Sequence, residues 1–196
     1  GIFGTAVDVS STLIILFTIY GAFLQLSGAG KFFLDWSFAA MGGKHTGAGR
    51  TVVLASFLLG GPSGSGVATT VTIGSVAYPM LKRSGYGPEA AGGLLAAGGL
   101  GAIISPPVLG AAAFLIAEFL KISYLDVLLM AVVPTILYYL SLFLMVEFDA
   151  RKFRMPVMAT AAKGELARLT GRYWYHFLSL ASIVVSYAGQ LARPVT

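Results

Sequence analysis

Residues 51–81 read TVVLASFLLGGPSGSGVATTVTIGSVAYPML, and none of these side chains carries a charge. As one helix the segment would be roughly 46 Å long, which exceeds the ~30 Å hydrocarbon core of a bilayer. Its centre, GGPSGSG at residues 60–66, is rich in residues that interrupt helices. The pattern therefore predicts two half-length helices that meet at a polar tip inside a membrane. Backbone exposed at that depth needs cover from protein or water, so such a tip is typical of a transport site.

The composition of the whole chain is that of an integral membrane protein. Of its 196 residues 57% are hydrophobic and 11% are charged, and the mean hydropathy is +0.83. The absence of cysteine excludes disulfides and thiolate metal sites. The formal charge of +5 does not indicate a nucleic-acid partner, because the basic residues cluster just outside the apolar segments, as they do on a cytoplasmic membrane face.

The order of apolar segments predicts an all-α membrane protein without a soluble domain. Because Gly1 opens almost directly into an apolar run, we expect the chain to be a piece of a longer polytopic protein. The predicted order is a transmembrane helix at 1–30, a cytoplasmic surface segment at 31–50, the re-entrant hairpin at 51–81, a broken transmembrane helix at 82–120, a transmembrane helix at 121–147, a basic cytoplasmic segment at 148–172 and a transmembrane helix at 173–196.

The lysines and arginines test how the interrupted segment is oriented. If it enters and leaves on the same side, 11 basic residues share one face and 2 lie on the other, whereas a full crossing gives 8 and 5. The asymmetry favours the re-entrant hairpin, with the basic face in the cytoplasm. That face holds Lys31, Lys44, Arg50, Lys82, Arg83, Arg151, Lys152, Arg154, Lys163, Arg168 and Arg172, and the other holds Lys121 and Arg193.

The hairpin tip offers hydroxyl groups and carbonyls at the end of its first half-helix. The second half-helix, which we expect to begin near Gly66 or Val67, points its amides and positive dipole end at the same place. Carbonyl and hydroxyl oxygens suit Na⁺, and exposed amides suit a carboxylate. The alternative is a packing role, in which Gly60 and Gly64 form a small-residue face and the serines bond their own backbone.

A second interruption lies at Ser105-Pro106-Pro107. Two prolines remove two amide donors, so carbonyls from about Gly101 to Ile104 lose their helical partners and are free to coordinate a cation. We expect the helix to resume over residues 108–119. The alternative is a simple proline kink cushioned by neighbouring helices.

At these residues the chain resembles a known family. The stretches GGPSGSGVA at 60–68, IGS at 73–75 and YPMLKRSGY at 78–86 are similar to the large membrane subunit of tripartite ATP-independent periplasmic (TRAP) transporters. The stretches AAGG at 96–99, AII at 102–104, PPV at 106–108 and GAAAF at 110–114 resemble the branch with fused permeases, which works with binding proteins of the TAXI type. The resemblance covers roughly residues 10–155 and is weaker from Met155 onward.

The resemblance implies a Na⁺-driven, elevator-type importer in the cytoplasmic (inner) membrane of a bacterium or archaeon. Such a permease receives an organic acid, such as a C4-dicarboxylate, from a periplasmic binding protein, and an inverted repeat supplies the remaining half of the site. Transferred by position, the sodium ligands would be Gly61, Ser63, Ser65, Gly99, Gly101 and Ile104. The substrate cleft would hold Ser65, Thr69 and Pro106. Many members carry serine and threonine where this chain has Gly98-Gly99-Leu100, so backbone carbonyls would have to serve there.

Two other functions are compatible with parts of the sequence. The pattern G-x-S-G at 61–64 fits the serine of rhomboid-type intramembrane proteases, with His176 as the base of a dyad with Ser63. However, Ser63 is predicted at mid-membrane and His176 at the basic interface, so we expect a protein that is not an enzyme. A passive channel or a membrane scaffold is the other alternative, because a re-entrant loop can line a pore.

Overall fold

The computed structural model describes residue 4, residue 7, residues 10–157 and residues 164–191, and their regular structure is helical. The predicted all-α fold is confirmed. The elements are the π-helix η1 Ser10–Ile14 and the α-helices α2 Ile15–Leu26, α3 Ala29–Met41, α4 Gly47–Ser63, α5 Gly66–Arg83, α6 Pro88–Ile104, α7 Ala112–Leu120, α8 Tyr124–Lys152, α9 Glu165–Tyr173 and α10 Tyr175–Leu191.

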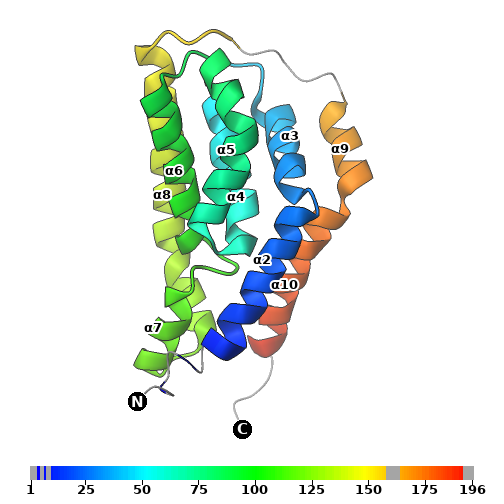
Figure 1. The fold of residues 1–196 in the computed structure, drawn as a ribbon, viewed down its shortest axis with the longest axis vertical. Coiled ribbons are helices and arrows are strands. Elements are labelled where there is room, and N and C mark those ends of the chain that lie inside the picture. The colour runs from blue at the N-terminus through cyan, green and yellow to red at the C-terminus, as the bar shows by residue number, and fades with distance from the viewer. Residues whose placement is uncertain (1–3, 5–6, 8–9, 158–163, 192–196) are drawn as a thin grey trace.

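Helices α4 and α5 form a hairpin whose two outer ends lie at one end of the molecule (Figure 1). Its tip reaches about half-way along the bundle. Helix α6 descends beside both arms, and a loop then leads to α7 at the opposite end (Figure 1). Helix α8 returns along α6 over the whole length of the bundle. The structure thus has a helical hairpin where the sequence predicted one, and its placement in a membrane stays a prediction.

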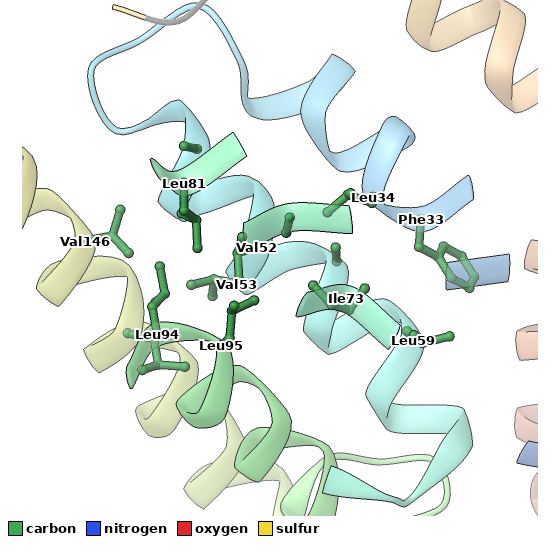
Figure 2. Packing of buried hydrophobic residues seen from close by; sticks show 14 of the residues in the cluster. Phe33, Leu34, Val52, Val53, Leu59, Ile73, Leu81, Leu94, Leu95 and Val146 are labelled. Carbon is green, nitrogen blue, oxygen red and sulfur yellow. The ribbon is translucent and has the colours of Figure 1, made fainter. Parts of the chain in front are cut away.

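The core lies between the hairpin arms, α6 and α8. Its buried side chains point toward one another (Figure 2): Val52 and Val53 from α4, Ile73 and Leu81 from α5, Leu94 and Leu95 from α6, and Val146 from α8. Inside a bilayer such a core is stabilised by close packing rather than by removal from water, so fit between the helices decides its stability.

The hairpin turn is shorter than the sequence predicted. The prediction that residues 60–66 interrupt the helix is correct only for Gly64 and Ser65, because α4 continues to Ser63 and α5 begins at Gly66. Proline keeps helical dihedral angles and removes one hydrogen bond, which neighbouring segments can compensate in a membrane protein. The turn itself is Gly64 and Ser65. Gly64 has a left-handed φ of 58°, and its amide donates to the carbonyl of Gly60.

The interruption after α6 is longer than predicted. The expected helix at 108–119 is wrong at its start, because α7 begins at Ala112. The amides that would begin it are used elsewhere: Val108 donates to the carbonyl of Gly61 and Gly110 donates to that of Ile103. Leu109 has a left-handed φ of 58°, which a helix cannot contain.

The remaining boundaries differ from the predicted ones by a few residues. The first helical segment ends at Leu26, and Gly28, with a φ of 82°, separates it from α3. Helix α3 packs along α4 with Phe32 and Phe33 buried, so much of the predicted surface segment 31–50 belongs to the bundle.

Helix α8 begins with a capping box between Ser123 and Asp126 and runs to Lys152, beyond the predicted limit at 147. Among the described helices it is the one that is long and apolar enough to cross a membrane by itself. Helix α9 lies in the predicted basic segment except for its last residue, Tyr173. Lys163 and Arg193, which entered the charge count, lie outside the described residues.

Candidate functional site

A pocket of about 590 Å³ lies where the hairpin tip, α2 and the loop between α6 and α7 meet. Every residue that lines it is uncharged, so any charge on a ligand must be met by dipoles, hydroxyl groups or a second ion. The lining consists of Ile14, Thr18, Gly21, Ala22, Gln25, Ser63, Gly64, Ser65, Gly66, Val67, Ala68, Ile103, Val108, Leu109, Gly110, Ala111 and Phe114.

The hairpin turn is held by the hydroxyl groups of its own serines. Ser65 is the N-cap of α5, and its side chain accepts a hydrogen bond from the amide of Ala68 at 3.3 Å. The hydroxyl of Ser63 lies 3.1 Å from that of Thr69 and accepts from the amide of Ser65 at 3.3 Å. Three side-chain oxygens therefore gather at the start of α5.

The first turn of α5 gives the pocket its electrostatic character. Gly66 and Val67 are the first two residues of α5 and line the pocket. Their amides are among those that no carbonyl of the same helix can reach. Together with the positive end of the helix dipole, they favour an anionic group. The arrangement can bind a carboxylate through backbone amides without a basic side chain.

The hairpin and α6 touch through glycine. A Cβ atom built on Gly99 would lie 1.8 Å from the Thr70 hydroxyl and 2.6 Å from the Gly66 carbonyl oxygen. That hydroxyl lies 2.8 Å from the Gly66 carbonyl oxygen and 3.4 Å from that of Leu95. Only a residue without a side chain allows this approach, so Gly99 sets how closely the start of α5 lies against α6.

The carbonyls at the end of α6 find partners other than helical amides. Ile104 accepts from the hydroxyl of Thr135 on α8 at 2.6 Å, and Gly101 accepts from the hydroxyl of Ser105 at 2.5 Å. Gly101 also lies against the ring of Tyr139, because a Cβ built there would be 2.5 Å from the phenol oxygen. This side of the interruption therefore faces α8.

The structure brings some of the predicted site residues together and separates others. Ser63 and Ser65 line the pocket, and Gly99 touches the start of α5. Gly61 is buried and lines a separate apolar pocket next to Pro106. Gly101 and Ile104 lie instead on the side of α8, where hydroxyl groups already donate to their carbonyls.

The three predicted substrate residues have three different environments. Ser65 lines the pocket. The side chain of Thr69 is fully buried beneath the turn, where its hydroxyl meets that of Ser63. Pro106 lines two apolar pockets, of about 290 and 570 Å³, on the side of α4, α8 and α10.

Sequence reasoning missed the contribution of α2. Thr18, Gly21 and Gln25 line the pocket, and a Cβ on Gly21 would lie 3.3 Å from the carbonyl oxygen of Ser63. Their spacing of three and four residues puts them on one face of the helix. That polar and small face in an otherwise apolar segment was the available signal, and the segment was interpreted only as a membrane crossing.

Ser63 and His176 do not form the contact that a serine–histidine dyad requires. The imidazole of His176 stacks on Phe32, with ring centroids 5.0 Å apart, and also lies against Tyr175. The hydroxyl of Ser63 has its partners within the hairpin. In the described part of the chain no hydrogen bond joins the two side chains, so this geometry offers no support for the protease alternative.

Comparison with known proteins shows which family the chain belongs to. Residues 2–195 match the family described as "Tripartite ATP-independent periplasmic transporter, DctM component". The chain belongs to this family. It is thus a piece of a TRAP transporter large permease subunit, and such subunits are multi-pass proteins of the inner membrane.

Three relatives illustrate the range of similarity within the DctM family. The C4-dicarboxylate TRAP transporter large permease protein DctM of Pseudomonas aeruginosa is 30% identical over 191 residues, which cover 96% of this chain and 44% of the relative. The 2,3-diketo-L-gulonate TRAP transporter large permease protein YiaN of Escherichia coli is 28% identical over 163 residues, 83% of this chain and 36% of the relative. The C4-dicarboxylate TRAP transporter large permease protein DctM of Rhodobacter capsulatus is 34% identical over 91 residues, which cover 46% of this chain and 21% of the relative. The chain thus spans less than half the length of these relatives.

Proposed function

We propose that this chain supplies one half of the transport site of a secondary importer for organic acids. The observation that carries the proposal is the uncharged pocket at the hairpin tip, where the first amides of α5 and the Ser65 hydroxyl converge. The names of two relatives mention C4-dicarboxylate and 2,3-diketo-L-gulonate, which are both carboxylates. A carboxylate is the kind of group that a helix N-terminus binds.

The hairpin is proposed to be re-entrant, entering and leaving from the cytoplasm. This topology puts both of its outer ends on one side of the membrane and its tip near the middle. Polar backbone at that depth is tolerated where it lines a cavity, and the pocket is such a cavity. The remaining half of the permease is proposed to close the site from the other side.

We propose that import is coupled to Na⁺. The oxygens available at the tip suit this ion, because Ser63 and Thr69 present hydroxyl groups 3.1 Å apart beside the carbonyl of Gly60. Ser63, Ser65 and the backbone of Gly61 and Gly99 are the proposed holders of the ion on the hairpin side. A bound cation would supply the positive charge that the lining residues lack. Gly101 and Ile104 remain proposed ligands through their carbonyl oxygens.

A periplasmic binding protein is the proposed source of the substrate, and the fused, TAXI-associated type of assembly is the proposed context. These partners, the inverted repeat and an elevator movement are properties of the complete transporter.

The test is uptake by the full-length permease, reconstituted in liposomes with its binding protein. A panel of C4-dicarboxylates and sugar acids is offered with and without a sodium gradient. Ser65→Leu fills the pocket wall and removes the cap of α5, so we expect uptake to fall roughly tenfold or more while membrane insertion is retained. The matched control is Ser141→Leu, an exposed serine of α8 that bonds only its own helix. Sodium-dependent uptake unchanged by Ser65→Leu would contradict the proposal.

A further inference from the structure

We propose that Thr135 of α8 is a positioning residue for the pocket, through the last carbonyl of α6. This inference rests on the proposed transport function, although Thr135 is absent from the pocket lining. The hydrogen bonds of the interrupted helix connect the loop both to the hairpin tip and to α8.

The loop gives one of its amides to the hairpin. In an uninterrupted helix the amide of Val108 would donate to the carbonyl of Ile104. It donates instead to the carbonyl of Gly61, in the last turn of α4, at 3.2 Å. Residue 108 lines the pocket, so this bond ties the pocket wall formed by the loop to the wall formed by the tip.

The exchange leaves the carbonyl of Ile104 without its helical donor, and Thr135 replaces that donor. The Thr135 hydroxyl lies 2.6 Å from the Ile104 carbonyl oxygen and 2.7 Å from that of Ala131 in its own helix. Thr135 as a whole is 5% exposed. Ile104 is half-buried, and a carbonyl shielded from solvent costs free energy when it lacks a donor, so the hydroxyl stabilises the conformation in which Val108 is free to bind Gly61.

Helix α8 also contacts α6 beside this bond, at two residues that follow Thr135 along α8. One helical turn away, the hydroxyl of Tyr138 donates to the carbonyl of Ala97 at 2.7 Å. The ring of Tyr139 fills the space above Gly101, which has no room for a Cβ atom. Thr135 therefore reaches Ile104 from a helix that packs against α6, and the pocket is coupled to a helix that does not line it.

The test compares Thr135→Val, Thr135→Ser and a control in the full-length permease. Valine keeps the shape of threonine and removes the donor, and serine keeps the donor. The control Thr51→Val removes another buried hydroxyl, whose bond is to Gly47 within its own helix. The first readout is uptake of radiolabelled succinate at increasing Na⁺ concentration. We expect the half-saturating Na⁺ concentration of Thr135→Val to rise about fivefold, the fold-change that one lost hydrogen bond gives, with the maximal rate little changed. Thr135→Ser and Thr51→Val should match the wild type.

The second readout is amide hydrogen exchange of residues 105–111, which does not depend on transport. Because Pro106 and Pro107 have no amide, the signal reports mainly Val108 to Ala111. We expect exchange about fivefold faster in Thr135→Val and unchanged in the other two variants. Equal exchange in Thr135→Val and wild type overturns the inference. If the wild type transports, an equal half-saturating Na⁺ concentration in Thr135→Val and wild type overturns it as well. If exchange responds but the wild type itself shows no sodium-dependent uptake of any acid in the panel, the proposed function fails and the positioning of the loop by Thr135 is supported.

Discussion

The hairpin turn and the interruption after α6 both break an apolar helix at the same pocket, but different parts of the molecule hold them. The turn between α4 and α5 is closed by its own residues: Gly64 donates back to Gly60, and Ser65 caps the helix that follows. The loop from Ser105 to Ala111 is closed by Gly61 of the hairpin, by Ile103 of α6 and by Thr135 of α8. The first interruption is a local structure, and the second depends on the fold around it.

Because of this difference, the turn and the loop are suited to different roles at the pocket. A turn that carries its own hydrogen bonds keeps its shape when its surroundings move, which suits a binding element. A loop that is hydrogen-bonded to three helices responds to movement of each of them, which, under the proposed function, suits a part that changes during transport. Substitutions at the turn, at its contact with α6 and at the outer end of the hairpin test this contrast.

The largest effect is expected at the hairpin turn. Gly64→Ala should lower the stability of the solubilised full-length protein by about 3 kcal/mol, because alanine strains a left-handed residue and its Cβ collides with the Leu109 carbonyl. Gly28→Ala separates these two causes, since Gly28 is also left-handed but a Cβ there would meet nothing within 4 Å. We expect it to cost about 1 kcal/mol. Thermal unfolding measures both, and equal losses would mean that the loop does not press on the turn.

A smaller loss is expected where the hairpin meets α6. Gly99→Ala places a methyl group against the Thr70 hydroxyl and the Gly66 carbonyl, so we expect a loss of about 2 kcal/mol after the gain in helix propensity. Gly93→Ala, in the same helix and with open space around it, should be neutral or stabilising by up to about 1 kcal/mol. Should Gly99→Ala unfold at the wild-type temperature, the close approach of α5 and α6 is not what fixes the tip.

The smallest effect is expected at the outer end of the hairpin. Arg50 of α4 and Glu147 of α8 form an ion pair of 2.6 Å, and both side chains are 28% exposed. A double-mutant cycle with Arg50→Gln and Glu147→Gln should give a coupling energy smaller than the loss expected for Gly99→Ala, because solvent screens the pair and Glu147 also has Arg151 as a partner. A coupling energy larger than the loss in Gly99→Ala would show that the hairpin is anchored to α8 at its outer end rather than by packing along its length.

The sequence was sufficient to predict the features that depend on local chemistry. An uncharged segment too long for one crossing, with glycine and serine at its centre, predicted the hairpin and the start of α5 near Gly66. The exact turn was not predictable in the same way, because a proline can either end a membrane helix or be tolerated within it, and α4 passes through Pro62.

The features that depend on distant residues were not predictable from local patterns. The prolines predicted a break after Ile104. The start of α7, however, depends on backbone hydrogen bonds from Val108 to Gly61 and from Gly110 to Ile103. Likewise the partner of the Ile104 carbonyl is Thr135, 31 residues further along the chain. Which face of α2 reaches the pocket also depends on how the helices pack. Hydrogen bonds between segments far apart in sequence leave little local signal.

The most direct test of this account is the sidedness of the two outer ends of the hairpin. Residues 1–196 contain no cysteine, so single cysteines can be placed at Lys44, Lys82 and Lys121 in a full-length protein with any other cysteine replaced. A membrane-impermeant maleimide is then applied to right-side-out and inverted vesicles. We predict that Lys44→Cys and Lys82→Cys react from the cytoplasmic side and Lys121→Cys from the opposite side. Reaction of Lys44→Cys and Lys82→Cys from opposite sides would contradict the re-entrant hairpin and the transport site built on it.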